Sequence, residues 1–451
     1  MSQQREIGVG MVGYAFMGRA HSLAWNTVSR VFDVPLRPRL AAIAGRDKAA
    51  TLAAADRLGW SAAETDWRAL IARDDVDLID ICAPGDLHAP IAIAALEAGK
   101  HVLCEKPLAN TLAEAAAMNA AADAAYDGGA RAMIGFNYRR VPALALARRL
   151  VEQGRIGTLR HFRAVYLQDW LADAAAPMTW RMQAERAGSG ALGDLGAHIV
   201  DLARFLTGDE ISGVSALSAT FVGSRPWAAG SNTGGSGTGT VTVDEAVLFT
   251  ARLASGALAS FEATRYATGR KNGLRVELNG SAGSLAFDLE RLNELEFYDA
   301  ADDGAESGFR RILVTEASHP YLSAWWPPGH TLGWEHTFTH EISDLLTAIA
   351  DGGQPSPSFA DGLAVQRVLH AAATSAANGN SWESVNLWRG LSPFSPASGR
   401  TCRSRRSAGW RVPGAMTGLR SPAGATTSRS TGRSARTATS PAAVRCWTST
   451  A

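Results

Sequence analysis

The stretch EIGVGMVGYAFMGRAH, residues 6–21, decides the fold of the first part of the chain. Residues 6–12 form a short apolar run of the kind that becomes a strand buried on both faces. A glycine-containing turn follows at Gly13, and the next residues have the composition of a helix. A strand that turns tightly into a helix opens a β–α–β unit, so the stretch predicts a parallel sheet.

The residues that follow repeat this alternation of short apolar runs and helical patterns. We expect strands at residues 7–12, 40–44, 76–82, 102–104 and 132–136, with helices between them such as 48–58, 90–98 and 111–124. The pattern predicts an α/β fold in which residues 1–140 form a Rossmann-type, dinucleotide-binding domain with a parallel sheet.

After about residue 155 the pattern changes to alternating strands separated by Ser-Gly, Asn-Gly and Ala-Gly turns, which are typical of antiparallel hairpins. Residues 228–240 are rich in Gly and Ser and are predicted to form a loop. Helical patterns at 337–351 and 361–378 follow. We therefore expect residues 141–388 to form an α+β domain with a large, mostly antiparallel open sheet.

The chain carries an unusual basic tail at residues 389–451, with 11 Arg and no Lys, Asp or Glu. The rest of the chain keeps 33 Lys and Arg residues against 43 Asp and Glu residues, so it is acidic and lacks a nucleic-acid footprint. The tail has no helical or strand period and is predicted to be disordered. Two interpretations stay open: a disordered basic arm, and the product of a shifted reading frame.

Composition also bears on the location of the protein and on metals. The N-terminus does not resemble a signal peptide, and no apolar stretch is long enough to span a bilayer. The four cysteines, Cys82, Cys104, Cys402 and Cys446, lack metal-type spacing. We expect a cytoplasmic protein without a membrane partner and without a metal.

The glycine turn is the first candidate site. A dinucleotide fold places glycines at three positions of such a turn, and here those positions hold Gly13, Ala15 and Gly18. The pyrophosphate would lie at the N-terminus of the helix, where unpaired N–H groups attract anions. On these residues alone, an ordinary tight connection between a strand and a helix stays open.

Two further clusters carry chemistry. Glu105-Lys106-Pro107 follows a predicted strand at the edge where open parallel sheets bind ligands, although a surface lysine there is the alternative. Asp194 and His198 are four residues apart, so a regular helix would place them on one face. The structural alternative is that Asp194 caps the helix, His198 packs in the core and Asp201 pairs with Arg204.

Together the three clusters resemble, in order and spacing, the Gfo/Idh/MocA (glucose–fructose oxidoreductase/inositol dehydrogenase) family. GFNYRR at 135–140, WRM at 180–182 and the segment beginning FADGLAVQRVLH at 359 also match, so the resemblance covers residues 5–388. Within the family, GYAFMGRAHSLAW and GHTLGWEHTF are most similar to members that act on inositols and on anhydro-sugars such as levoglucosan.

The resemblance implies an oxidoreductase that passes hydride from a secondary alcohol of a sugar, anhydro-sugar or inositol to NAD or NADP. It implies that His198 is the base, that Lys106 stabilises developing alkoxide charge, and that Asp194 orients the imidazole or binds a neighbouring hydroxyl. The expected cofactor-binding residues are Gly13, Ala15, Phe16, Met17, Gly18, Arg46, Pro84, His88, Glu105 and Lys106. The expected substrate-binding residues are Tyr138, Arg139, Trp180, Arg181, Asp194, His198, His330 and His336.

Several alternatives stay open. Gly45 occupies the place of the acid that commonly holds the ribose of NAD, with Arg46 next to it, so the choice between NAD and NADP is unresolved. Some family members use bound NAD transiently to cleave glycosides, which is one alternative. A dinucleotide-sensing regulator on this scaffold that has lost catalysis is another. Family members commonly pair their open sheets, which implies a homodimer or homotetramer.

Overall fold

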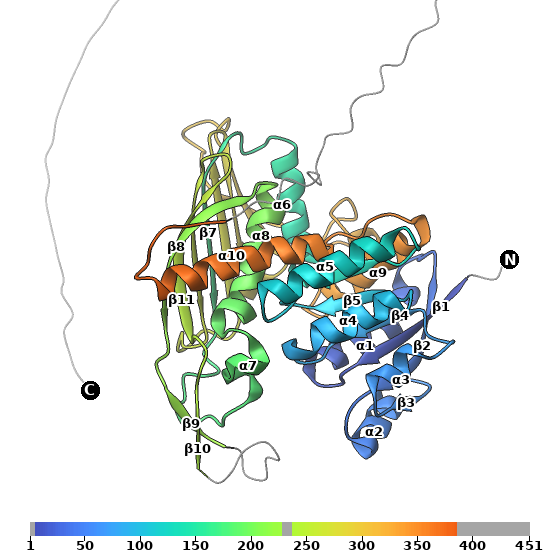
Figure 1. Ribbon diagram of the computed structural model, residues 1–451. Helices are drawn as coiled ribbons and strands as arrows, with labels where there is room; N and C mark the ends of the chain where they lie inside the picture. Colours follow the sequence, from blue (N-terminus) through green and yellow to red (C-terminus); the bar gives the residue numbers. More distant parts are fainter. Residues whose placement is uncertain (1–4, 228–236, 386–451) are drawn as a thin grey trace, which may run out of the picture. The chain divides into compact units, whose positions relative to one another are not determined.

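The computed structural model describes residues 5–227 and 237–385, and its first sheet is fully parallel (Figure 1). The strand order is β3-β2-β1-β4-β5-β6, which is the Rossmann order. The strands are β1 (Glu6–Val12), β2 (Arg37–Ala44), β3 (Ala63–Glu64), β4 (Leu78–Ile81), β5 (His101–Glu105) and β6 (Ala132–Gly135). The predicted Rossmann-type sheet is confirmed.

The connecting helices begin and end at residues suited to those positions. Asp47 caps the first turn of its helix by accepting from the Ala50 N–H at 2.8 Å, and Gly59 ends that helix with a φ of 83°. Thr111 and Glu114 form a reciprocal capping box. The helices are α1 (Phe16–Val31), α2 (Lys48–Leu58), α3 (Trp67–Ile71), α4 (His88–Glu97) and α5 (Leu112–Tyr126).

The second sheet has nine strands in the order β16-β15-β14-β13-β7-β12-β11-β8-β17. The pairing of β7 with β12 is parallel and the other pairings are antiparallel, so the predicted mostly antiparallel sheet is confirmed. The strands are β7 (Leu159–Leu167), β8 (Ile211–Ala219), β11 (Ala246–Leu253), β12 (Leu258–Thr264), β13 (Gly273–Gly280), β14 (Gly283–Asp288), β15 (Glu294–Asp299), β16 (Arg310–Leu313) and β17 (Glu383–Ser384).

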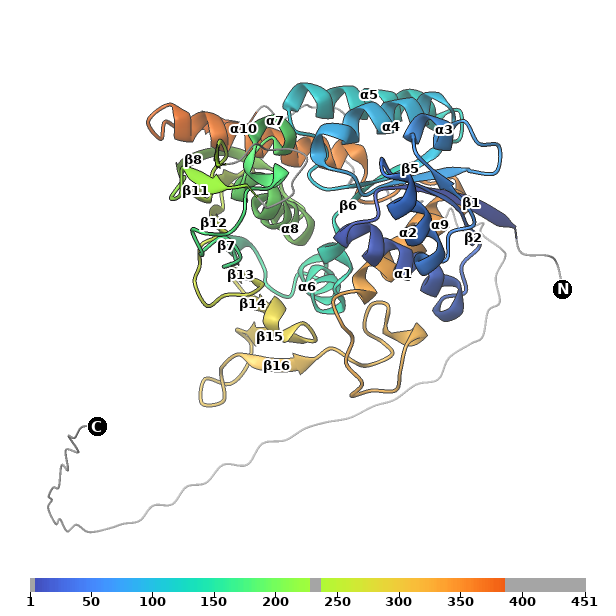
Figure 2. The same cartoon turned by 90° about the horizontal axis from the view of Figure 1, so that it is seen from below.

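Helices cover one face of this sheet. They are α6 (Pro142–Glu152), α8 (Ala197–Thr207) and α10 (Phe359–Ala377), and Figures 1 and 2 show them on the same side of the strands. Along β11 the burial pattern alternates, so every second side chain points away from these helices. Leu217 and Leu248 are opposite each other in the register of β8 and β11, and both are exposed.

The last third of the chain returns to the first sheet. α9 (His336–Asp351) packs on α1, and its Phe338, Ile342 and Leu345 share a buried cluster with β1. The Ile134 N–H of β6 donates to the Pro357 carbonyl at 3.1 Å. Residues assigned by the sequence to the domain 141–388 therefore also complete the core around the dinucleotide fold.

Two predictions concern residues at the edge of the described part. Residues 238–240, predicted as loop, form β10 (Thr238–Thr240), which pairs with β9 (Ser224–Pro226). Residues 228–236 and the basic tail 389–451 lie outside the described residues. Within the described ranges, no helix is both long enough and apolar enough to cross a membrane.

Candidate active site

The glycine turn has the geometry that a dinucleotide requires. Gly13 adopts a φ of 98°, where a side chain would be strained. A Cβ on Gly18 would lie 2.2 Å from the Gly13 carbonyl oxygen, so only glycine lets the first turn of α1 approach the strand so closely. Ala15 is exposed and caps α1 without a side-chain hydrogen bond, and the first turn carries no acidic residue. The N–H groups of this turn therefore suit a pyrophosphate, and Ala15 leaves them accessible.

Phe16 and Met17 make different contacts at this turn. Phe16 is 62% exposed, yet its ring stacks on Trp334, with 5.4 Å between centroids and 8° between planes. Met17 packs against the buried cluster that contains β1. Trp334, which is far from this turn in the sequence, thus contacts the turn at the predicted cofactor site.

The end of β2 explains the missing acid. A Cβ on Gly45 would lie 2.1 Å from Cε1 of Tyr14 and 2.7 Å from Oγ1 of Thr51, so a side chain there would require these two side chains to move. The next acid, Asp47, is used as the cap of α2. Arg46 is exposed beside this edge, where its predicted contact with the cofactor is possible in space.

Pro84 and His88 follow β4 at the same edge of the sheet. Pro84 precedes the short turn Gly85–Leu87, and His88 opens α4. Nδ1 of His88 lies 2.9 Å from the Pro107 carbonyl oxygen, and Nε2 lies 3.0 Å from that of Ala83. Burial lowers the pKa of His88. The imidazole therefore joins the loops after β4 and β5, and its predicted contact with the cofactor stays a prediction.

Lys106 connects the two sheets. It follows β5, and its Nζ donates to Oδ1 of Asp194 at 3.0 Å and to the Asp194 carbonyl oxygen at 2.8 Å. Oδ2 of Asp194 accepts from Nη2 of the buried Arg265 at 3.0 Å. Burial alone would raise the pKa of Asp194, but the charges of Lys106 and Arg265 hold it well below its ordinary value. Asp194 is a carboxylate between two cations.

The helix that carries Asp194 and His198 is not regular. Residues Leu192–Gly196 form a π turn, and α8 begins only at Ala197. The wider turn replaces the regular helix that the spacing predicted, although the charge of Asp194 still acts on His198. Both oxygens of Asp194 face cations, and Nδ1 of His198 has no hydrogen-bond partner among the described residues. Single π turns of this kind are frequent at functional sites.

His198 is a buried, neutral base. His198 is only 6% exposed. Burial is the main cause that lowers the pKa of its imidazole well below 6.5, and the charge of Lys106 lowers it further. The negative charge of Asp194 opposes this shift only in part. The imidazole is thus unprotonated at neutral pH and is able to accept a proton.

Aromatic rings surround His198. Its ring centroid lies 4.6 Å from that of Tyr138 and 5.8 Å from that of Tyr166. The two tyrosine hydroxyls are 2.7 Å apart. This brings Tyr138, a predicted substrate-binding residue, directly to the predicted base.

Trp180 and Arg181 lie on the short turn Trp180–Met182 at the same site. The Arg181 guanidinium lies 4.5 Å above the Trp180 ring, and its charge contributes to the low pKa of Asp194. The Arg181 carbonyl oxygen accepts from Nη1 of Arg265 at 3.3 Å. The charge of Arg181 therefore acts on Asp194, and the roles of Trp180 and Arg181 in substrate binding stay predictions.

The other predicted substrate residues make their contacts elsewhere. Arg139 is buried and donates through Nε to Oδ2 of Asp201 at 2.8 Å, a partner that the sequence had assigned to Arg204. His330 is exposed, with Nδ1 2.8 Å from the Pro327 carbonyl oxygen. His336 packs edge-on against Trp325. The described contacts do not join these three residues to His198, and their roles in substrate binding stay predictions.

Arg265 and Trp334 were missed in the sequence. Arg265 directly follows β12, so a basic residue at the end of an alternating strand was the available signal. Trp334 belongs to the GHTLGWEHTF stretch, where only the histidines were singled out. Their distance along the chain from Lys106 hid both of them.

Comparison with known proteins agrees with this geometry. Residues 7–129 match the model of an oxidoreductase family with an NAD-binding Rossmann fold, and residues 144–286 match the GFO/IDH/MocA C-terminal domain. Levoglucosan dehydrogenase of Pseudarthrobacter phenanthrenivorans is 44% identical over 390 residues, which cover 84% of this chain and 98% of that protein. The chain belongs to the GFO/IDH/MocA oxidoreductase family.

Solved structures of the family superpose well on this chain. An oxidoreductase domain protein from Kribbella flavida is 60% identical, with a TM-score of 0.82, and the match covers 85% of this chain and 100% of that chain. A complex of levoglucosan dehydrogenase with NADH is 43% identical, with a TM-score of 0.80 and the same coverage. The N-terminal part of this GFO/IDH/MocA chain is thus an NAD-binding Rossmann domain, and its family contains NAD-dependent sugar dehydrogenases.

Asp194 pairs with both Lys106 and Arg265, and the first prediction concerns the second of these two ion pairs. Arg265→Gln removes one charged hydrogen bond, which contributes about 1.5–3 kcal/mol, so we expect kcat/KM to fall about 10- to 100-fold. Steady-state kinetics with the reduced-nicotinamide absorbance would measure it, with thermal unfolding to show that the variant is folded.

The matched control is Arg270→Gln. Arg270 is 42% exposed and pairs with Glu290 at 3.1 Å on the surface, so kcat/KM should change less than about twofold. An unchanged rate in folded Arg265→Gln would show that Asp194 does not depend on the second cation.

Proposed function

We propose that this protein oxidises a secondary hydroxyl of a neutral anhydro-sugar, with levoglucosan as the first candidate and inositols and aldoses as the next. The observation that carries the proposal is the neutral, buried imidazole of His198 beside the Lys106–Asp194 pair at the carboxyl end of β5. The 44% identity to levoglucosan dehydrogenase over nearly its whole length supports the choice of substrate.

The glycine turn and the N-terminus of α1 would hold the pyrophosphate of NAD, and the strand ends that carry Glu105 and Lys106 would lie beside its nicotinamide. When bound, the nicotinamide supplies the hydride acceptor. The chain's own residues then have to bind the sugar, remove its hydroxyl proton and stabilise the charge that develops on oxygen.

His198 takes the hydroxyl proton in this proposal. The C–H bond releases its hydride as the O–H bond gives its proton to the imidazole, so the alcohol becomes a ketone and His198 becomes an imidazolium. The charge of Lys106 lies where the oxygen becomes negative, and it stabilises that charge more strongly in the transition state than in the bound alcohol. Asp194 neutralises part of this charge and fixes the position of Nζ.

Aromatic groups give the site its preference for sugars. Tyr138 borders His198, and Trp180 carries Arg181 above its ring. Flat aromatic faces suit the C–H face of a sugar ring, while hydroxyl and guanidinium groups suit its oxygens. These residues would orient one ring carbon toward the hydride acceptor.

A substrate panel tests the proposal. We expect reduction of NAD or NADP with levoglucosan, inositols or aldoses, followed by the reduced-nicotinamide absorbance. His198→Ala should lower kcat at least about 100-fold, because general-base catalysis contributes about that much or more. The exposed His370→Ala serves as the matched control and should retain the wild-type rate.

Other outcomes separate the alternatives. Cleavage of a glycoside without net reduced cofactor would indicate transient oxidation and contradict the proposed dehydrogenase. Tight dinucleotide binding without turnover of any substrate in the panel would instead favour a regulator.

The pH dependence gives a further prediction. Because the pKa of His198 is lowered below 6.5, the active neutral form persists as the pH falls, and the acid limb of kcat/KM should lie below pH 6.5. Burial is the main cause, and the charge of Lys106 adds to it. Lys106→Ala should therefore move the limb to higher pH, as measured by kcat/KM between about pH 5 and 9.

Asp194→Asn is the control of opposite sign, because Asp194 raises the pKa of His198. Its acid limb should move to lower pH. If the acid limbs of Lys106→Ala and Asp194→Asn moved equally and in the same direction, His198 would be excluded as the titrating base.

We also propose a homo-oligomer in which a second copy covers the open face of the nine-stranded sheet. Leu217, Leu248 and Leu258 are each about half exposed on that face, at 56%, 49% and 47%. Burying the exposed half of one such leucine contributes about 1 kcal/mol. Small pockets on the face are lined by both charged and apolar side chains, which suits a specific contact.

Leu248→Lys tests this surface. It places a charge in the centre of the proposed contact, so light scattering after size exclusion should show smaller particles than for the wild type. Leu52→Lys, at a 52% exposed position on α2, should leave the mass unchanged. A wild-type mass of one chain at micromolar concentration would contradict the proposal.

A further inference from the structure

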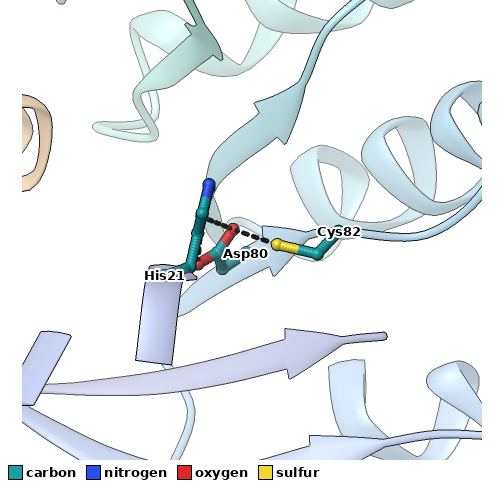
Figure 3. A group of neighbouring side chains, drawn as sticks. All are labelled: His21, Asp80 and Cys82. Atoms are coloured by element: carbon teal, nitrogen blue, oxygen red, sulfur yellow. Dashed lines mark hydrogen bonds and ion pairs between the residues drawn. The ribbon is translucent and has the colours of Figure 1, made fainter. Parts of the chain in front are cut away.

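A buried histidine lies between carboxylates behind the catalytic lysine. His21, on α1, is 1% exposed, and its Nδ1 lies 3.0 Å from both oxygens of Asp80. Its Nε2 lies 3.0 Å from Oε1 of Glu105. Figure 3 shows His21 beside Asp80 and Cys82 near the end of β4. None of these contacts is used in the mechanism proposed above.

The arrangement suits a charged imidazole, which has a donor for each of the two acidic side chains. An ionised carboxylate accepts hydrogen bonds and donates none, so both ring nitrogens must carry a proton to serve Asp80 and Glu105 together. Burial alone would lower the pKa of His21, but the charge and hydrogen bond of Asp80 raise it well above 6.5. Asp80 is further held by Nε1 of Trp25, which donates at 2.7 Å.

The remaining neighbour, α9, adds no second cation to this cluster. Its Phe338 ring lies 5.2 Å from the His21 ring. Its Glu341 is fully buried, and neither carboxyl oxygen has a hydrogen-bond partner within the described residues. Burial raises the pKa of Glu341 to about 8, so it is mainly protonated at neutral pH. His21 is thus the positive charge that Asp80 and Glu105 share.

The same place has the composition of a metal site but not its protonation. His21, Asp80 and Cys82 bring ligand-type atoms within 4.8 Å of one another. An imidazolium has no free lone pair for a metal, and burial raises the pKa of the Cys82 thiol, which opposes the thiolate form. The donor set therefore suits a proton-bridged ion pair better than a divalent cation.

Glu105 transmits this contact to the active site. Its Oε1 faces His21, and its Oε2 accepts from the backbone N–H of Lys106 at 3.2 Å. A Cβ on Gly135 would lie 3.3 Å from Oε1, so the glycine at the end of β6 leaves room for the carboxylate. Nζ of Lys106 in turn donates to Oδ1 of Asp194 at 3.0 Å.

We propose that His21 is a positioning residue for Lys106. It ties the carboxyl ends of β4 and β5 to α1, so the helix that receives the phosphates and the lysine that serves the reacting oxygen keep one fixed relation. The inference rests on the proposed function, because it concerns the placement of Lys106 for that reaction.

Imidazolium is suited to this task because its two N–H groups point to opposite sides of one rigid ring. Glutamine has both donors on one nitrogen and presents an oxygen on the other side. His21→Gln would therefore leave Glu105 or Asp80 as a buried carboxylate facing a second acceptor, which is strongly unfavourable.

A double-mutant cycle tests the proposal. His21→Gln should lower kcat about tenfold or more, while the dissociation constant of NADH, measured by fluorescence without substrate, changes less than about threefold. In a Lys106→Ala background the same substitution should change kcat less than about twofold, because coupled residues are non-additive. Equal losses in both backgrounds would overturn the proposal. Full activity of Lys106→Ala would instead contradict the proposed function, so the two failures are distinguishable.

Trp25→Phe is the matched control. It removes the indole donor to Asp80 but keeps His21, Glu105 and the Cys82 thiol, which donates to Oδ1 of Asp80 at 3.6 Å. The Tm should therefore fall while kcat stays within about twofold. An equal loss of kcat in Trp25→Phe would show that any disturbance of this region is sufficient, and would overturn the proposal. Stoichiometric zinc in the purified protein that disappears in His21→Gln would overturn it as well.

Two further measurements keep the inference testable. If His21→Gln does not fold, Glu105→Gln takes its place, because the amide retains one acceptor but not both, and the same non-additivity with Lys106→Ala is expected. If the kcat of Lys106→Ala is too low to measure a further loss, a crystal structure of His21→Gln tests the proposal through the position of the Lys106 side chain. We expect Nζ of Lys106 to have left Asp194, and an Nζ still within about 3.2 Å of both Oδ1 and the main-chain oxygen of Asp194 would overturn the proposal.

Discussion

The ion pair between Lys106 and Asp194 joins the end of a parallel strand to a π turn that packs on the second sheet. Nζ binds the main-chain oxygen of Asp194 as well as its carboxylate. The backbone of the π turn therefore helps to position the lysine side chain that follows β5. Arg265 holds the second carboxylate oxygen from the end of β12.

This ion pair also bears on how His198 is positioned and on its protonation state. Nδ1 of His198 has no hydrogen-bond partner among the described residues, and the imidazole packs among Tyr138, Tyr166 and Phe136. Packing in an apolar surround keeps the imidazole neutral, whereas a direct carboxylate contact would have favoured its protonated form. The same ion pair that supplies positive charge to the reacting oxygen therefore also leaves the base free to act.

Much of the fold was predictable because strand and helix periods are local properties. The ranges expected for the helices at 48–58 and 337–351 agree with α2 and α9 within one residue at either end. The short β3 has only two residues and gives no periodic signal. The return of α9 to the first sheet was not predictable, because no local pattern states which of two apolar cores a helix will join.

The site was predictable in its residue types more than in their partners. Lys106 and the Asp194–His198 spacing were visible as motifs, whereas Arg265 reaches Asp194 only through the register of a sheet formed by distant segments. The π turn was hidden because a spacing of four was taken to mean a regular helix. Arg139 shows the converse, since its buried partner Asp201 depends on how α8 packs.

The contact between Gly45 and Tyr14 has an evolutionary consequence. Because the tyrosine ring fills the space that a side chain at position 45 would need, the residue after β2 cannot change alone. An acid there would first require a smaller residue at position 14, and a smaller residue there would by itself leave a gap beside Thr51. For a carboxylate to stand at the end of β2, positions 14 and 45 would therefore have to change together.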